Sequence, residues 1–202
     1  GLRTNVLNDV FFMVRENRNW SGVGYFVRTQ ITNSIAAMAG PVGTLYRFEI
    51  TVPEWQLQAE HPSLFVRAYD LSRLGRSGMK NLARVLEGVV HFRVRAYDTN
   101  GFWINPLDFG TNTPIHRSLF LSGFPVQGEV AVSQFYERAV PAFVEVEIGV
   151  LERQALERYQ AIPVLPGGND TARRNYLQQQ IGRVHVFRQR IPIRNVDFAA
   201  YQ

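Results

Sequence analysis

Residues 89–97 constrain the fold of this chain more than any other stretch, because their side chains alternate strictly in character. A period of two puts one set of side chains on a buried face and the other toward water, which predicts a half-buried β-strand. Gly88 ends a helical pattern just before the strand, and residues 98–101 follow it with turn chemistry. The expected inner set is Val90, Phe92, Val94 and Ala96, and the expected outer set is His91, Arg93, Arg95 and Tyr97.

The composition is that of a globular protein and excludes several kinds of site. With 202 residues, 46% of them hydrophobic, the chain is long enough to bury a core. The absence of cysteine excludes a disulfide-stapled scaffold, a thiolate metal site and a cysteine nucleophile. The net charge is +5, but Lys80 is the only lysine, and the arginines are scattered among apolar residues. Because no block of like charges occurs, we expect no nucleic-acid partner.

The remaining periodicities predict an α+β fold. Helical spacing predicts two helices within residues 151–182, which we expect to decorate one edge of the sheet. A short helix with Ser77 near its start is expected to end at Gly88, and residues 64–69 fit a short strand or an irregular segment. Because strands dominate, we predict a mostly antiparallel sheet in one domain. Further strands are expected over residues 20–27, 44–52, 143–150 and 183–193.

The chain opens with a pattern that predicts a helix over residues 2–16. Apolar residues recur every four positions there, which is typical of one helix face. No clear capping residue precedes the pattern, so we expect the helix to continue an element from before residue 1. No apolar run reaches the ~18–20 residues of a membrane helix, and no signal peptide is visible. The recurring residues are Leu2, Val6, Val10 and Val14, with Leu7 and Phe11 beside them.

Glu145 and Glu147 form a pair of carboxylates on the expected solvent face of the strand predicted over residues 143–150, whose expected core face is Val144, Val146, Ile148 and Val150. Arg93 and Arg95 have the same spacing, so a cross-strand ladder of ion pairs is the interpretation we favour, at roughly 0.2–1 kcal/mol per pair. Paired carboxylates also perform acid–base catalysis. An enzyme that uses the two glutamates together with His91 therefore stays open as one alternative hypothesis.

Other polar motifs are weak. His61, His91, His116 and His185 lack the spacing of a metal site, so we expect no metal and no cofactor. No nucleophile motif and no phosphate-binding loop are present in the sequence. Aromatic residues beside the long loops, namely Tyr97, Phe102 and Trp103, support a second hypothesis, a β-rich extracytoplasmic module that binds a carbohydrate or a peptide.

Three segments, in this order, carry short motifs that together resemble those of one known family. Residues 85–98, followed by Gly101, Phe102 and Trp103, resemble the family's block of leucine, acidic residue, glycine, valine and a basic–apolar strand before glycine and tryptophan. Residues 139–148 resemble its proline-led strand of alternating valine and glutamate, and residues 186–195 its closing strand. Together the three segments resemble the minor pilin-like proteins of type II secretion and type IV pilus systems. The nearest groups are the minor pseudopilins J and the pilus-assembly W proteins.

This resemblance implies a structural subunit that is not an enzyme and takes no small-molecule substrate. It implies a pilin-like fold over residues 1–202, with residues 1–16 as the stub of an N-terminal helix that packs on the sheet of residues 17–202. A hydrophobic helix before residue 1 would anchor the protein in the inner membrane, with the sheet domain in the periplasm. Other minor pseudopilins or pilins are the implied partners. The expected assembly surface on the helix is Leu2, Val6, Val10 and Phe11.

Overall fold

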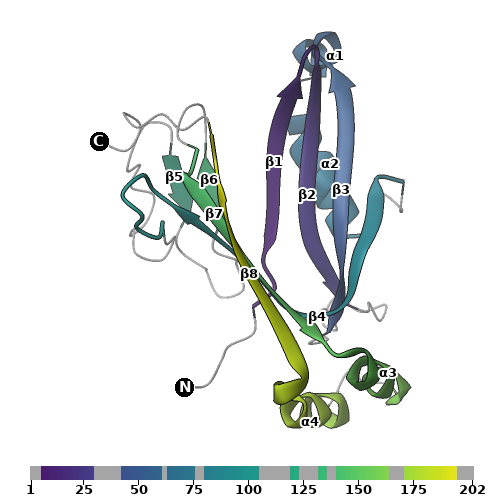
Figure 1. Ribbon diagram of the computed structural model, residues 1–202. Coiled ribbons are helices and arrows are strands. Elements are labelled where there is room, and N and C mark those ends of the chain that lie inside the picture. The colour runs from purple at the N-terminus through teal and green to yellow at the C-terminus, as the bar shows by residue number, and fades with distance from the viewer. Residues whose placement is uncertain are drawn as a thin grey trace. The chain divides into compact units, whose positions relative to one another are not determined.

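A computed structural model gives the architecture of the chain (Figure 1). Eight strands and four α-helices are described. The described residues are 6–29, 42–60, 63–75, 80–104, 119–122, 132–135, 140–163 and 171–194. The strands are β1 (Asp9–Glu16), β2 (Asn19–Thr29), β3 (Gly43–Pro53), β4 (Leu82–Tyr97), β5 (Leu119–Ser122), β6 (Val132–Phe135), β7 (Phe143–Leu151) and β8 (Val184–Pro192). The helices are α1 (Glu54–Glu60), α2 (Ser63–Arg73), α3 (Arg153–Ala161) and α4 (Thr171–Gln179), with a 3-10 turn at Ile181–Arg183.

Six of these strands form an open antiparallel sheet in the order β1-β2-β3-β4-β7-β8, and β5 and β6 form a separate antiparallel pair. This confirms the α+β class and the mostly antiparallel sheet. The strands expected near residues 20–27, 44–52, 143–150 and 183–193 are confirmed as β2, β3, β7 and β8. The two helices expected within residues 151–182 are confirmed as α3 and α4.

The chain divides into two compact units, and β4, β7 and β8 run from one into the other. The first unit contains residues 1–93 and 148–187, and the second contains residues 94–147 and 188–202. Within the described residues, no helix is both long and apolar enough to cross a membrane.

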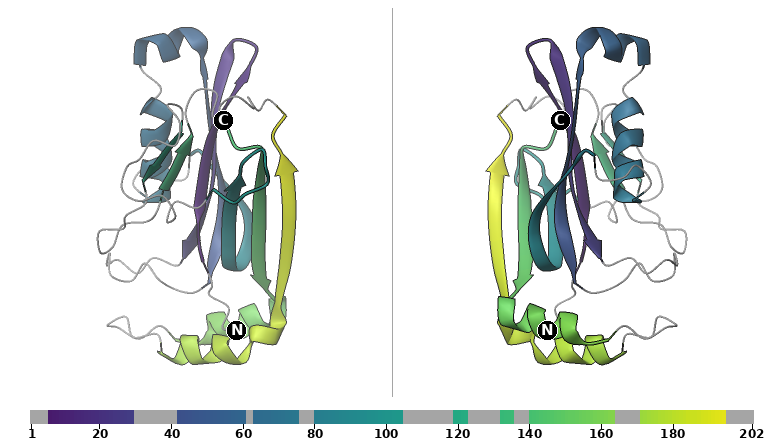
Figure 2. Two further views of the ribbon diagram at one scale, coloured as in Figure 1. Left: turned by 90° about the vertical axis from the view of Figure 1, so that its left-hand side faces the viewer. Right: turned by 90° about the vertical axis from the view of Figure 1, so that its right-hand side faces the viewer.

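In the first unit, α2 lies against the sheet of β1, β2 and β3 (Figure 2). Its Tyr69 ring packs edge-on against Phe26 and Phe48, at centroid distances of 5.8 and 5.6 Å. Gly24 of β2 makes this approach possible, because a Cβ there would lie 2.3 Å from the Tyr69 ring. A second cluster joins α3 to the sheet through Ala155 and Tyr159, packed with Val90 and Leu151 among others.

The helix predicted over residues 2–16 is wrong wherever the structure describes it. Residues 9–16 form β1, an edge strand that pairs along its whole length with β2, from Asp9 opposite Phe26 to Glu16 opposite Asn19. A spacing of four residues is also a multiple of the strand period of two, so the same pattern fits one strand face. Long-range pairing with β2 supplies the backbone hydrogen bonds that a helix would have made internally.

The helix expected to end at Gly88 is also wrong from residue 82 onward, where the chain is already strand β4. The glycine has φ +73°, as a helix-ending glycine would. It is instead the extra residue of a β-bulge, since Thr44 lies opposite Glu87 and Gly43 opposite Val89. Ser77, the expected cap, lies outside the described residues. Residues 64–69, expected as a short strand or irregular segment, belong to α2.

In the second unit, the turn predicted after the central strand is confirmed. The Asp98 carboxylate accepts hydrogen bonds from the backbone N–H groups of Asn100, at 2.9 Å, and Phe102, at 2.7 Å. The turn returns the chain so that Trp103 forms a bridge opposite Tyr97. The Tyr97 ring stacks on Phe143 of β7, at a centroid distance of 5.0 Å.

Candidate functional site

The most unusual group of side chains in the second unit surrounds Glu145 of β7, which is only 1% exposed. The backbone N–H of Ile193 donates to the carbonyl of Ala142 at 2.9 Å, which fixes the antiparallel register of β7 and β8. In that register Arg190 stands directly opposite Glu145, and Arg188 lies two residues along on the same face. The sequence pattern of both strands thus brings two arginines onto one buried carboxylate.

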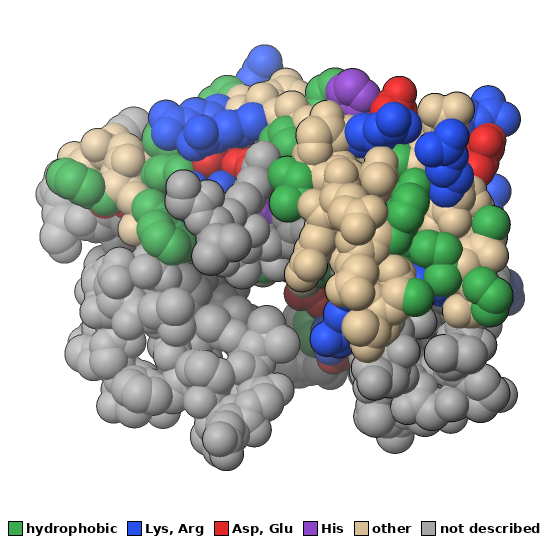
Figure 3. Space-filling model, turned by 90° about the horizontal axis from the view of Figure 1, so that it is seen from below, with side chains coloured by type: hydrophobic (Ala, Val, Ile, Leu, Met, Phe, Trp, Pro, Cys, Tyr) green, Lys and Arg blue, Asp and Glu red, His purple; other side chains and the backbone are tan. Residues whose placement is uncertain are grey.

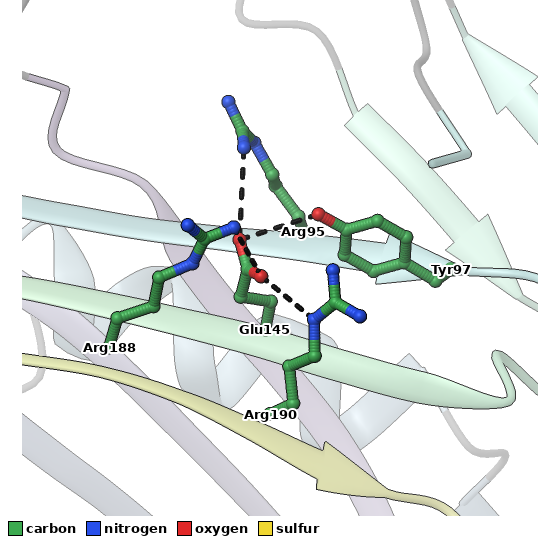
Figure 4. A network of polar contacts seen from close by, with 5 residues as sticks. All are labelled: Arg95, Tyr97, Glu145, Arg188 and Arg190. Atoms are coloured by element: carbon green, nitrogen blue, oxygen red, sulfur yellow. Dashed lines mark hydrogen bonds and ion pairs between the residues drawn. The ribbon is translucent and has the colours of Figure 1, made fainter. Parts of the chain in front are cut away.

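Four side chains contact the Glu145 carboxylate (Figure 4). Arg188 Nη2 donates to Oε2 at 2.7 Å and Arg190 Nε donates to the same oxygen at 3.1 Å. Oε1 accepts a hydrogen bond from the Tyr97 hydroxyl at 3.3 Å, and Arg95 Nη1 lies 3.7 Å from it. Three guanidinium groups therefore lie against Glu145, and the charge of Glu147, on the same face of β7, also acts on Arg188. Three positive charges thus face two negative ones.

Aromatic rings hold two of these guanidinium groups in place, those of Arg190 and Arg95. Arg190 lies over the rings of Tyr97 and Phe143, at 5.0 and 5.2 Å from their centroids. Arg95 lies over the indole of Trp103 at 4.8 Å. Such cation–π contacts fix the plane of each guanidinium while its N–H edges stay available for hydrogen bonds. The outer members of the group face solvent, since the side chains of Arg188 and Arg190 are 54% and 57% exposed.

Burial raises the pKa of the Glu145 carboxyl, but the hydrogen bonds from Arg188 and Arg190 outweigh it and hold the pKa below its ordinary value. The same hydrogen bond from Arg188 to Glu145 raises the pKa of the Arg188 guanidinium. The hydrogen bonds and charges of Arg188 and Arg190 therefore favour the ionised form of Glu145. The exposed arginines of this group can bind further anionic groups.

The ladder predicted between the two pairs on β4 and β7 is confirmed for Arg95 and Glu145. The predicted orientation of that face is wrong, because Glu145 and Glu147 are buried and Val144 and Val146 are only half-buried. Alternation shows that a strand has two faces, but it does not show which face another element covers. Arg188 and Arg190 were missed as members of the group, although their spacing of two residues matches that of Arg93 and Arg95.

Two of the residues expected on the assembly surface of the helix, Val10 and Phe11, do not share one face in the structure. Leu2 lies outside the described residues. Val10 and Phe11 are neighbours on β1 and project to opposite faces of the sheet, and Phe11 packs against the α2 cluster around Tyr69. The backbone N–H of Val6 donates to His91 Nδ1 at 3.0 Å. Val10 and Phe11 therefore belong to different faces of β1 and cannot form one continuous surface on it.

The two histidines that the structure describes, His91 and His185, have separate environments. His91 is 2% exposed and accepts the bond from Val6, whereas His185 is exposed on β8. His61 and His116 lie outside the described residues. Among the residues that are described, no group of three or more His, Asp or Glu side chains could hold a metal ion.

An open groove of about 810 Å³ lies in the first unit, with Val85, Leu156 and Phe187 among its lining residues. Figure 3 shows a face on which basic, acidic and apolar side chains lie next to one another. Because the charges at the groove are paired with each other, they indicate no ligand of a particular charge. The pairs are Arg84–Glu87 at 2.6 Å and Arg153–Glu157 at 3.0 Å.

Comparisons of the chain with protein-family models, with curated proteins and with solved structures find no match.

Proposed function

We propose that this chain is a minor pilin-like subunit of a type II secretion or type IV pilus-like filament, which acts through protein–protein contacts and not as an enzyme. One observation carries the proposal. The three segments that resemble the family fall mainly on β4, β7 and β8, which are consecutive neighbours in the sheet. Segments far apart in the sequence thus belong to one continuous half of the sheet, as the parts of one inherited structural motif would.

The chemistry of Glu145 supports a non-enzymatic role. A catalytic carboxyl needs a pKa matched to proton transfer near the working pH. The pKa of Glu145 is lowered instead, and its oxygens accept hydrogen bonds from Arg188, Arg190 and Tyr97. Its surroundings are those of a structural ion-pair network.

The helix expected over residues 2–16 gives the proposal no support, because residues 9–16 form β1. The proposal rests on the three strand segments. It includes an inner-membrane anchor encoded before residue 1, a periplasmic sheet domain, and other minor pseudopilins or pilins as partners.

Processing by a prepilin peptidase tests this proposal. The gene would be expressed with its natural upstream coding region, in cells with and without the peptidase, and the mass of the product measured. We expect a shorter product only in the cells with the peptidase, and an apolar segment of about 20 residues after the cut. The same mass in both kinds of cell, or an upstream region without such a segment, would contradict the proposal.

A specific observation favours a second candidate function, an extracytoplasmic module that binds a carbohydrate or a peptide. Trp103 is 44% exposed and Phe102 is 72% exposed, so aromatic surface is available beside the Asp98 turn. Titration of the tryptophan fluorescence with oligosaccharides tests it. Binding would shift the emission of the native chain, and Trp103→Ala would remove the shift. An unchanged spectrum with every sugar would remove carbohydrate binding from consideration.

A further inference from the structure

The strand β8 closes one side of its sheet and is hydrogen-bonded to β7 alone among the described strands (Figure 2). An edge strand presents a row of backbone N–H and C=O groups that another strand can pair with. The part of β8 in the second unit, residues 188–192, carries the two exposed arginines of the Glu145 group. We call these five residues the arginine edge.

The register shows which backbone groups of the arginine edge point outward. In an antiparallel pair, residues alternate between those whose N–H and C=O face the partner strand and those that face away. Ile193 bonds to Ala142, so Ile191 and Gln189 share its inward orientation, and Arg188 and Arg190 face away from β7. Pro192, which has no N–H, takes an outward position, where it removes no bond to β7.

The outward backbone and the charged side chains therefore belong to the same two residues. A strand added to this edge places its side chains directly opposite those of Arg188 and Arg190, on the same face of the sheet. Each guanidinium carries five N–H donors, and the hydrogen bonds to Glu145 come from Arg188 Nη2 and Arg190 Nε. The other face of the arginine edge presents Ile191, which is 44% exposed.

The charge of β8 indicates which kind of strand can pair with its free edge. Residues 183–194 contain four arginines and no acidic residue. A second copy of β8 in antiparallel pairing would place arginines against arginines, which is unfavourable. The inner neighbour β7 shows the complementary pattern, because its Glu145, Val146 and Glu147 alternate acidic, apolar and acidic.

We propose that the arginine edge is a docking site for a β-strand of another protein in which two carboxylates flank one apolar residue. The inference rests on the proposed function, since a subunit that works through protein contacts needs a docking surface, and it names the chemistry of the partner. Arg188 and Arg190 would form ion pairs with the two carboxylates of the docked strand. Their outward N–H and C=O groups would form hydrogen bonds with its backbone, and Ile191 would contact its apolar residue.

Amide hydrogen exchange of the isotope-labelled full chain, followed by NMR, tests the inference. The probe is a short end-blocked peptide of alternating Glu and Val, and the control is the same peptide with Lys in place of Glu. In the free chain, the amides of Arg188 and Arg190 should exchange faster than those of Gln189 and Ile191. The Glu–Val peptide should slow Arg188 and Arg190, more weakly at high salt, whereas the Lys–Val peptide should leave them unchanged.

A matched pair of variants checks the role of charge. Arg188→Gln leaves Arg190 and Arg95 on Glu145 and should weaken peptide binding roughly two- to fivefold, the range of one surface ion pair. Arg153→Gln removes the same charge from α3, where the side chain is 92% exposed, and should leave binding unchanged. Continued protection of Gln189 and Ile191 in Arg188→Gln would show that the β7–β8 ladder is intact.

Three results would each overturn the inference. They are equal binding of the two peptides, binding without slower exchange at Arg188 and Arg190, and amides there that are already slow in the free chain, which would mean that the edge is occupied. The processing assay is independent of all three. A processed protein that fails the peptide test would lose only the docking edge, and an unprocessed protein that binds the peptide would lose only the filament role.

Discussion

Glu145 places a negative charge where only 1% of the residue is exposed, and burial of a charge is costly unless it is paired and hydrogen-bonded. Here the cost is offset by hydrogen bonds from Arg188, Arg190 and Tyr97. Two of the partners are half-exposed, so water can solvate them when the carboxylate is removed. Loss of the carboxylate should therefore lower the free energy of unfolding mainly through the lost hydrogen bonds. The arginines left without a partner should contribute less, because water can solvate them.

We expect Glu145→Gln to lower the free energy of unfolding by about 1–3 kcal/mol, the range of hydrogen bonds to a charged group. Urea denaturation measures this change. The matched control is Glu157→Gln on α3, whose partner Arg153 is 92% exposed and whose loss should cost less than about 0.5 kcal/mol. Equal effects of the two substitutions would show that the Glu145 group contributes little to stability.

The lowered pKa of Glu145 also sets the direction of a pH effect. A carboxyl whose pKa is lower in the folded state stabilises the fold above its unfolded pKa, about 4.3 for Glu. This contribution is lost as the pH falls below that value and through the folded pKa. The native chain should therefore lose stability more steeply with acid below about pH 4 than Glu145→Gln does. Parallel curves of unfolding free energy against pH would contradict the assignment.

Gly24 is required by a close approach of α2 to β2. A Cβ at this position would lie 2.3 Å from the ring of Tyr69, so Gly24→Ala should cost about 1–3 kcal/mol through overpacking. Gly182→Ala is the control, because a Cβ there meets nothing within 4 Å. Thermal unfolding of the two variants should show a lower midpoint for Gly24→Ala alone.

In β1, the local apolar spacing indicates a helix, whereas the long-range pairing with β2 makes the segment a strand. If residues 9–16 are a strand, Val14 and Ser21 are cross-strand partners on one face, whereas Met13 projects to the other face. The chain contains no cysteine, so any disulfide that forms in a variant must join the two introduced cysteines. Val14→Cys with Ser21→Cys should form a disulfide under mild oxidation, since paired Cα atoms lie within the range that a disulfide spans.

The control pair is Met13→Cys with Ser21→Cys, which should stay reduced. Thiol alkylation followed by mass spectrometry distinguishes the two outcomes. Failure of both pairs to bridge would favour the helix that the apolar spacing of residues 2–16 indicates.

The elements that could be predicted from the sequence are those whose pattern fits only one period. β3 and β7 alternate cleanly, and α3 switches to helical spacing directly after β7. β1 was missed because a spacing of four suits both periods. The first half of β4 was missed because its bulge glycine, Gly88, has the positive φ that also ends helices. In both cases pairing with a distant strand decided the structure.

The candidate site was predictable only in part, because the pairing of distant strands also decides which of its side chains are buried. The pairing of Arg95 with Glu145 follows from equal spacing on two strands. The burial of Glu145 does not, because it depends on the register of β8, which is fixed by backbone bonds such as that from Ile193 to Ala142. Local sequence specifies a strand's two faces, and the neighbouring strands specify which face is covered.

At the scale of the whole molecule, the net charge is +5, and the charged side chains that the structure describes do not form one basic field. In the first unit, charged side chains pair on the surface, as Arg84 does with Glu87 and Arg153 with Glu157. In the second unit, three arginines share Glu145, and this concentrates positive charge at the β8 edge. This distribution is the basis on which we propose an acidic strand as the partner of the arginine edge.

We propose that the protein assembles with other minor pseudopilins or pilins. Co-purification from native membranes is the direct measurement of this assembly. The full-length protein would carry a C-terminal tag, be cross-linked in the cell, and be isolated with its partners for mass spectrometry. We expect other subunits with prepilin-type leaders to be cross-linked to it, and to be lost when its own leader cleavage site is substituted. Recovery of the processed protein from those membranes without any such subunit would contradict the claim.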